Sequence, residues 1–390
     1  MVPRAAEPTL KRLAGYYPVV ALTGPRQSGK TTLARAAFED KPYASLEDPD
    51  IRDFAVADPR GFLAQYPEGA VLDEAQNCPD LFSYLQTRVD HDARPGQFVL
   101  TGSQQFGLVS GISQTLAGRV GLVHLLPFSL GELAAAGKLP ALETLLWQGA
   151  YPPVHDRRIP PQLWYRDYMA TYVERDVRQM VNVRDLTAFR TFVRMCAART
   201  AQPLNLSTLA SDCGITHNTA KAWLSVLEAS YLAFLLPAHH RNFGKRLVKA
   251  PRLFFYDSGL AAWLAGVQSP QQLGTGTLRG ALFETWAAAE FVKFRNNRAL
   301  SPALYYWRDS NGNEIDLLVE HATGTVPVEL KSGQTISGDW FEPLDKYLAW
   351  SQGKRGLLVY GGDARQTRRA ISVYGWRDIE RAAATAFGIP

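Results

Sequence analysis

A loop framed by two glycines carries the clearest chemical signal in this sequence. Gly24 and Gly29 enclose four residues, Lys30 and Thr31 follow, and an apolar run at 19–22 comes before them. A strand, a loop of this spacing and a helix make a Walker A motif, whose backbone N–H groups surround phosphate oxygens. Lysine supplies a mobile charge for the β- and γ-phosphates, and the threonine hydroxyl holds Mg²⁺. A glycine turn that binds nothing is the alternative, but the flanking strand and helix favour the motif.

The motif predicts ATP and Mg²⁺ as ligands. The residues expected around the nucleotide are those of the loop and the first helical turn: Gly24, Pro25, Arg26, Gln27, Ser28, Gly29, Lys30, Thr31 and Thr32.

Two acids follow a second apolar run. Ala70 to Leu72 is typical of a buried strand, and Asp73 and Glu74 end it, which is the Walker B pattern. Asp73 is expected beside Mg²⁺, and Glu74 is expected to act as general base on the attacking water. Ser103, after the next apolar strand, is a candidate for facing the γ-phosphate, with a simple turn as the alternative.

These motifs require a parallel α/β sheet. Apolar segments alternate with helical ones in the first third of the chain, as such a sheet demands. Strands are expected near 18–23, 43–46, 70–73, 97–101 and 120–125. The fold class predicted for this part is therefore α/β, a P-loop NTPase sheet.

Length and composition exclude several classes of protein. The 390 residues are enough for two or three domains, and 46% apolar with 20% charged residues is typical of a globular chain. No apolar run reaches the roughly 18 residues of a membrane span, and the N-terminus lacks the apolar core of a signal peptide. Cys78, Cys196 and Cys213 are odd in number and far apart. We expect a cytoplasmic protein without disulfides or a zinc site.

Positive charge is concentrated in the middle of the chain. Residues 151–278 hold 15 Lys and Arg against 8 Asp and Glu, whereas the whole chain has a net charge of only +5. A localised basic region is the usual mark of a polyanion partner, here double-stranded DNA. The preference for arginine over lysine can equally reflect a GC-rich genome.

The segment from Leu206 to Glu228 has the pattern of a helix-turn-helix. Ser207 and Thr216 are expected to cap its two helices, and Gly214 lies in the turn between them. The outward residues of the second helix and the basic stretch after it, which has the pattern of a wing, are the candidate DNA contacts. These residues are His217, Asn218, Lys221, Arg241, Lys245 and Arg246. A contact between subunits or domains is the alternative role.

The C-terminal third combines a helix and two strands that carry charged residues. Glu284 lies on an apolar helix expected through Phe294, and the runs 312–319 and 326–331 alternate like paired strands. Alternation puts Glu329 and Lys331 on one face, next to Asp316 if the strands form a hairpin.

The whole pattern resembles a known family. The phosphate loop, the LDEAQ acids, the TGS strand end and the LAGR and LLPFSLGEL stretches resemble prokaryotic AAA-plus-type ATPases that carry a C-terminal domain of unknown function with a nuclease-like fold. By that resemblance, Arg119 reaches the γ-phosphate of a neighbouring subunit, which implies a homo-oligomer. No second sensor arginine is evident after the fifth strand.

The C-terminal residues resemble the PD-(D/E)xK nuclease family in the order Glu, Asp, Glu-x-Lys. By this resemblance, Asp316 and Glu329 hold Mg²⁺, Lys331 orients the attacking water and Glu284 completes the site. The alternative is a retained fold whose acids are neutralised by Lys331 or Arg308.

Three domains are expected on these grounds. They are an AAA-type ATPase domain at 1–145, a helical linker or lid with a winged helix at 146–278, and a restriction-endonuclease-like α/β domain at 279–390. The predicted function is Mg²⁺-dependent ATP binding and hydrolysis, acting on or with DNA and without a membrane. The alternatives are an ATP-gated metal-dependent nuclease and a nucleotide switch that binds another protein.

Overall fold

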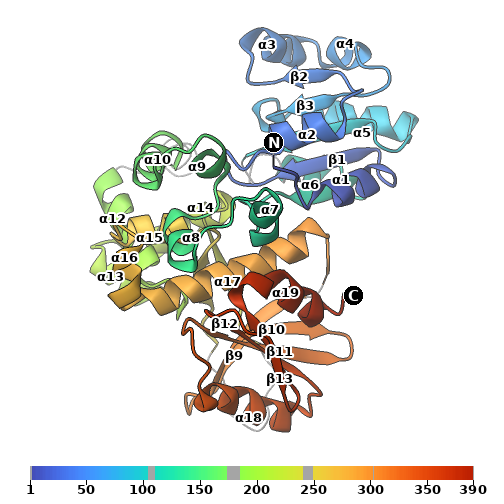
Figure 1. The fold of residues 1–390 in the computed structure, drawn as a ribbon. Coiled ribbons are helices and arrows are strands. Elements are labelled where there is room, and N and C mark those ends of the chain that lie inside the picture. Colours follow the sequence, from blue (N-terminus) through green and yellow to red (C-terminus); the bar gives the residue numbers. More distant parts are fainter. Residues whose placement is uncertain (1, 104–109, 174–184, 240–248, 302, 390) are drawn as a thin grey trace. The chain divides into compact units, whose positions relative to one another are not determined.

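The computed structural model describes residues 2–103, 110–173, 185–239, 249–301 and 303–389. The chain divides into two compact units (Figure 1). The first unit comprises Met1–Phe128, Ala229–Tyr231 and Asn296–Ala299, and the second comprises Ser129–Glu228, Leu232–Arg295 and Leu300–Pro390.

The first unit alternates strands with helices along the chain. Its elements are α1 (Glu7–Ala14), β1 (Val19–Thr23), α2 (Lys30–Ala37), β2 (Tyr43–Ser45), α3 (Pro49–Ala57), α4 (Pro59–Ala64), β3 (Val71–Asp73), the 3₁₀ turn η1 (Ala75–Asn77), α5 (Leu81–His91), β4 (Phe98–Gly102), α6 (Ser110–Thr115) and β5 (Val120–His124). All five strands that the sequence predicted here are present, each within one or two residues of its expected bounds.

The five strands form a parallel sheet in the order β2-β3-β4-β1-β5. Alternation along β1 sends successive side chains to opposite faces. Val20 and Leu22 pack with α1 and α2, while Val19 and Ala21 pack with side chains from α3 to α6. Both faces are thus covered, which is why the strands are largely apolar, with their polar residues near the carboxyl ends. The predicted parallel α/β sheet is confirmed.

The second unit contains two further sheets and most of the helices. Elements that lie wholly or mostly in it are α7 (Leu130–Ala135), α8 (Leu142–Gln148), α9 (Pro152–Asp156), α10 (Pro161–Tyr168), the π-helical turn η3 (Met169–Val173), α12 (Leu186–Ala198), β6 (Gln202–Pro203), α13 (Leu206–Asp212), α14 (His217–Ala229), β7 (Ala233–Leu236), β8 (Arg252–Phe255), α15 (Ser258–Leu264), α16 (Gln271–Thr275), α17 (Leu278–Asn297), β9 (Leu304–Arg308), β10 (Glu314–His321), β11 (Gly324–Lys331), η4 (Gly338–Phe341), α18 (Glu342–Ser351), β12 (Gly356–Tyr360), β13 (Gln366–Arg368), β14 (Ile371–Gly375), η5 (Trp376–Asp378) and α19 (Ile379–Phe387).

The larger sheet of this unit has six strands in the order β13-β14-β12-β11-β10-β9. Strands β10 and β11 pair antiparallel with Leu317 opposite Val328, so the expected hairpin is present. Helix α18 lies on one face of the sheet, and α17 and α19 lie on the other (Figure 1). The smaller sheet, β6-β8-β7, is antiparallel and belongs to the middle of the chain.

The two helices expected in the segment 206–228 are present as α13 and α14. Thr216 caps α14, because its hydroxyl accepts a hydrogen bond from the Thr219 N–H at 3.1 Å. The expected Ser207 cap of α13 is wrong. Asn205 is the capping residue there, and its side chain accepts from the Thr208 N–H at 3.1 Å. Asn caps a helix as well as Ser does, and it lies directly before the first helical residue.

Within the described residues, no helix is both long and apolar enough to cross a bilayer.

Candidate functional site

The phosphate loop connects β1 to α2 and takes a shape that only its glycines permit. Gly24 has φ +147°, and a Cβ there would lie 2.1 Å from the carbonyl oxygen of Leu125. Gly29 has φ +92° immediately before the first residue of α2, and no side chain caps that helix. The backbone therefore turns tightly at both ends of the loop, as the spacing predicted.

Two observations show that this loop fits a phosphate ligand. The Ser28 hydroxyl is fully buried and has no hydrogen-bond partner among the described residues. The Lys30 ammonium lies over the loop, where it donates to the carbonyl oxygens of Gly24 at 3.1 Å and Pro25 at 2.8 Å. A buried hydroxyl without a partner is costly, and an anion in the loop would satisfy both groups.

Asp73 is held at the end of β3 by three hydroxyl groups. Thr31 donates to it at 2.8 Å, Tyr43 donates at 2.8 Å, and Thr101 makes a shorter contact. Burial and the bond to Asp73 raise the pKa of Tyr43 to about 12, so its phenol stays protonated as a donor. The predicted pair of Mg²⁺ ligands, Thr31 and Asp73, is thus brought together from two different elements. Hydroxyl and carboxylate oxygens are the donor set that Mg²⁺ prefers.

Glu74 comes next, on a strained backbone. Its φ is +53°, in the left-handed region, and its N–H donates to the Thr101 hydroxyl at 3.2 Å. The Glu74 carboxylate accepts from the Ser103 hydroxyl at 3.0 Å and from the Gln76 amide. Positive φ outside glycine is concentrated at functional sites. Ser103, which was predicted to face the γ-phosphate, thus contacts Glu74, the predicted general base.

Arg4 is a site residue that the sequence did not indicate. Its guanidinium donates to the carbonyl oxygens of Ser28 and Leu126, both at 2.6 Å, and lies 4.9 Å from the centre of the Phe128 ring. Arg4 is only 9% exposed. It therefore ties the backbone of the phosphate loop to the segment after β5.

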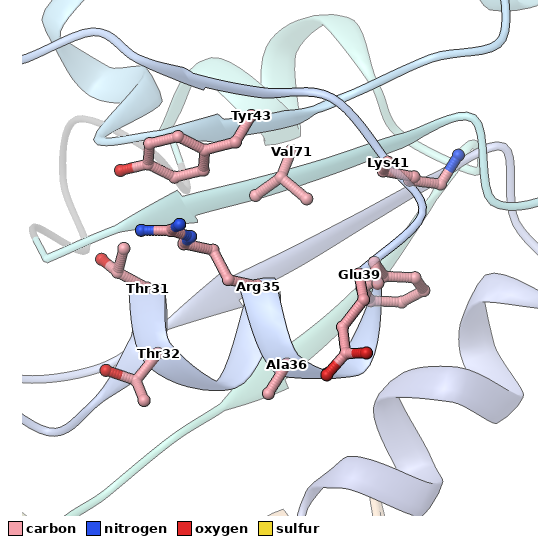
Figure 2. A pocket seen from close by; sticks show the side chains of 9 residues that line it. Thr31, Thr32, Arg35, Ala36, Glu39, Lys41, Tyr43 and Val71 are labelled. Carbon is pink, nitrogen blue, oxygen red and sulfur yellow. The ribbon is translucent and has the colours of Figure 1, made fainter.

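A pocket of about 490 Å³ lies along α2, and its lining extends from Thr31 in the first turn to Glu39 beyond the end of the helix (Figure 2). Thr31, Thr32, Arg35, Lys41 and Tyr43 are among its lining residues, and the Arg35 guanidinium lies 4.8 Å from the centre of the Tyr43 ring. The pocket thus borders Thr31 and Tyr43, two of the residues that hold Asp73.

Arg119 lies immediately before β5, where it is engaged within its own unit. Its guanidinium makes two contacts with the Asp90 carboxylate, one of them at 2.9 Å. The Asp90 bond raises the pKa of Arg119, and the Arg119 bond lowers the pKa of Asp90. The side chain of Arg119 is 35% exposed, so it is accessible at the surface of the unit.

The candidate DNA residues in α14 lie on its outer face. His217, Asn218 and Lys221 are exposed, while Ala220 and Leu224 are buried. The other candidates, Arg241, Lys245 and Arg246, lie outside the described residues.

The four C-terminal candidates converge. The Asp316 carboxylate accepts from the Leu330 N–H at 2.9 Å, and Lys331 contacts Glu329 at 2.5 Å. Glu284, from α17, meets them through Arg252, which donates to both Glu284 and Asp316. No role in this site was predicted for Arg252. Its only signal was a charged residue at the start of the apolar run 253–256.

Comparisons with known proteins agree with the first part of this description. A family model described as an AAA domain matches residues 16–134. Two family models described as domains of unknown function match residues 139–271 and 279–378. The parallel sheet, the phosphate loop and this match define an AAA-type P-loop ATPase domain at the start of the chain.

Relatives are found over nearly the whole length. The chain is 32% identical over 367 residues to the uncharacterized proteins Rv2008c of Mycobacterium tuberculosis and Mb2031c of Mycobacterium bovis. The match covers 93% of this chain and 80% of each relative. The chain belongs to the family of these mycobacterial proteins.

Solved structures show more distant likeness. The Walker-type ATPase PABY2304 of Pyrococcus abyssi matches 68% of this chain and 96% of its own, with 15% identity and a TM-score of 0.46. AMPPCP-bound DnaA of Aquifex aeolicus matches 57% of this chain and 85% of its own, with 16% identity and a TM-score of 0.30.

Proposed function

We propose that this protein is a Mg²⁺-dependent ATPase that hydrolyses ATP in connection with DNA. The observation that carries the ATPase part is the contact of Thr31 with Asp73 at 2.8 Å beside Glu74, itself held by Ser103 at 3.0 Å. This arrangement places a metal-binding pair next to a carboxylate suited to a general base, at the end of β3.

The roles of the side chains follow from their chemistry. Thr31 and Asp73 would hold Mg²⁺, which neutralises phosphate charge during transfer. Lys30 exchanges its two loop carbonyls for phosphate oxygens when ATP binds. Glu74 orients the attacking water and accepts its proton, and the Ser103 bond fixes the direction of the Glu74 carboxylate. Phosphoryl transfer depends chiefly on such positioning and charge.

DNA is the partner that the middle of the chain favours. Residues 146–278 form, in this proposal, a linker with a winged-helix domain, and α14 presents His217, Asn218 and Lys221 to solvent. Polar and basic side chains on the exposed face of the second helix suit a major groove. Arg241, Lys245 and Arg246 would add phosphate contacts from the wing.

Two further assignments belong to the proposal. Residues 279–390 are assigned a nuclease-like fold, because the β10–β11 hairpin carries Asp316 and Glu329 as the PD-(D/E)xK resemblance implies. A homo-oligomer is assigned on the position of Arg119, which is accessible directly before β5.

A nucleotide-dependent DNA titration at several salt concentrations tests the function. Glu74→Gln protein, which holds ATP without hydrolysing it, is compared with nucleotide-free and ADP-bound wild type. We expect the affinity for duplex DNA to differ between the ATP-bound and ADP-bound forms and to fall with salt, by a log–log slope of about 0.9 per phosphate contact. Lys245→Ala, at a proposed phosphate contact of the wing, should lower that slope, whereas Lys346→Ala, on α18, serves as the matched control.

Other results would contradict parts of this proposal or favour one of its alternatives. ATP hydrolysis without any salt-sensitive DNA affinity would contradict the DNA part and favour a nucleotide switch that binds a protein. Wild-type turnover in Glu74→Gln would contradict the assignment of Glu74 as general base, whereas a wild-type protein without ATP turnover would contradict the ATPase assignment itself. Metal-dependent cleavage of plasmid DNA would favour an ATP-gated nuclease.

A further inference from the structure

A cluster of acids in the second unit surrounds an arginine. Glu284 comes from α17, Glu314 and Asp316 from β10, and Glu329 from β11. Asp316 and Glu329 are 7% and 4% exposed. Buried carboxylates that lie close together require a cation to balance their charge.

Arg252 supplies that cation from the strand β8 of the smaller sheet. One terminal nitrogen of its guanidinium lies 2.7 Å from a Glu284 oxygen, and the other lies 2.9 Å from Glu314 and 3.2 Å from Asp316. The Arg252 side chain is only 6% exposed. Burial opposes its charge, but Asp316, Glu284 and Glu314 outweigh burial and raise the pKa of Arg252.

The position of Arg252 is set by its own strand. Its Nε donates to the Ala201 carbonyl oxygen at 2.8 Å, and β8 pairs with β6 and β7 on either side. The smaller sheet therefore fixes the guanidinium, which lies between Glu284 of α17 and two acids of β10, Glu314 and Asp316. An arginine fork matches several carboxylates at once, which a lysine would not.

The Glu329 carboxylate is only partly satisfied by the part of the chain that the structure describes. Glu329 contacts Lys331 through one carboxylate oxygen, while its second oxygen is buried and has no hydrogen-bond partner among the described residues. Burial first, and then the charge of Asp316, raise the pKa of Glu329 well above its usual range. The cluster thus holds more acid oxygens than its arginine and lysine satisfy.

The same residues do not fit a metal ion as they stand. Arg252 already engages Glu284 and Asp316, two of the oxygen donors that the nuclease resemblance assigns to the site. Within the described parts of the chain, no three His, Cys, Asp or Glu side chains lie in an arrangement able to hold a metal ion.

We propose that Arg252 is the resident cation of this cluster, closing a latent divalent-metal site that forms only when the arginine is withdrawn or replaced. In the wild-type protein the acids then serve to dock β8 against α17 and β10. Removal of the guanidinium leaves Glu284, Glu314 and Asp316 without their shared partner. These three acids and Glu329 would then move together around an ion, because their hard oxygen donors suit Mn²⁺ or Mg²⁺.

Mn²⁺ binding to the full chain without nucleotide tests the proposal, with free Mn²⁺ followed by electron paramagnetic resonance. Four proteins are compared: wild type, Asp316→Asn, Arg252→Met, and the double variant. We expect wild type and Asp316→Asn to bind the same number of ions. Arg252→Met should bind one more, and the double variant should lose it again. Arg381→Met, which removes an arginine that is 70% exposed, is the control for loss of positive charge.

Three results of these measurements would overturn the proposal that Arg252 is the resident cation. A wild-type site that disappears in Asp316→Asn would overturn the proposal, because metal and Arg252 would then coexist. A folded Arg252→Met protein without an extra site would also overturn it. Should Arg252→Met fail to fold without metal, Mn²⁺ is expected to restore its circular dichroism and its cooperative melt, but not those of the double variant. Failure of Mn²⁺ to restore them would overturn the proposal too.

Discussion

The phenol oxygen of Tyr231 lies 2.9 Å from the hydroxyl of Thr23, the residue directly before the phosphate loop. His124, at the end of β5, joins the pair through its Nδ1, 2.8 Å from Thr23 and 3.0 Å from Tyr231. Tyr231 has φ +55° and belongs to the first unit, although it follows α14 by two residues. Within the first unit, the short segment that follows the proposed DNA-binding helix along the chain is therefore tied to the start of the nucleotide site.

Tyr231→Phe should loosen this tie. The change removes one buried hydroxyl, so we expect the free energy of unfolding to fall by about 1 kcal/mol and the difference in DNA affinity between nucleotide states to shrink. Thermal melts and DNA titrations measure the two effects. Tyr16→Phe, at a tyrosine that is 72% exposed, should change neither. Equal behaviour of the two variants would show that the contact does not couple the elements.

Substitutions at Lys30 and Glu74 should affect two different properties, ATP affinity and ATP turnover. Lys30 touches the bound phosphates, so Lys30→Ala should reduce ATP affinity severely, by about 100-fold or more. Glu74 acts on the water, so Glu74→Gln should keep the affinity and lower turnover by 10²–10⁴-fold. Equilibrium binding of a fluorescent ATP analogue and release of phosphate measure the two quantities. Equal loss of affinity in both variants would contradict this division of roles.

The sequence predicted those residues because their chemistry follows from local spacing. Gly24 to Thr31 is one continuous loop, and Asp73 with Glu74 directly ends an apolar strand. The hairpin of β10 and β11 was predictable for the same reason, since alternation along two short segments determines which side chains share a face.

Arg4 and Arg252 were not predictable, because the contacts that define them join distant segments. Arg4 meets the carbonyl of Leu126, and Arg252 meets Asp316. A single arginine has no periodicity, and Arg252 is the last residue of the basic stretch whose wing-like pattern favoured a DNA contact instead. Only the tertiary fold shows that its guanidinium is buried among acids.

Arg119 is paired with Asp90 of its own chain. To reach the nucleotide of a neighbouring subunit, Arg119 must first leave Asp90. An exposed ion pair contributes little to stability, so exchange of Asp90 for a phosphate is cheap. We expect Arg119→Ala to lower turnover at least 10-fold with nearly unchanged ATP affinity, and Asp90→Ala to keep or raise turnover. Turnover is measured against protein concentration. A rate per chain that stays constant down to a demonstrated monomer would exclude the role in trans.

His155 should make the second unit sensitive to acid. Burial lowers the pKa of His155, whose Nε2 lies 2.9 Å from the Gly149 carbonyl oxygen. The unfolded chain therefore takes up a proton near pH 6.5, while the folded chain takes it up only at lower pH. The free energy of unfolding should fall as pH drops from about 7 through the folded pKa, and His155→Gln should flatten this fall. Urea melts at several pH values compare the two proteins, and parallel profiles would contradict the assignment.

Arg4 offers the sharpest test of how the phosphate loop is held. Its two bonds, both 2.6 Å, tie Ser28 to Leu126, so one side chain joins the loop to the segment after β5. Arg4→Met retains the apolar contact with Phe128 but removes both donors, and it should weaken ATP binding about 10-fold. Arg4→Lys should give a partial loss, because one ammonium reaches two separated carbonyls poorly. Lys11→Met, at a nearby lysine whose side chain is 52% exposed, is the control and should bind ATP normally. Calorimetric titration with a non-hydrolysable analogue measures each affinity. Wild-type affinity in a folded Arg4→Met protein would show that the glycines alone maintain the loop.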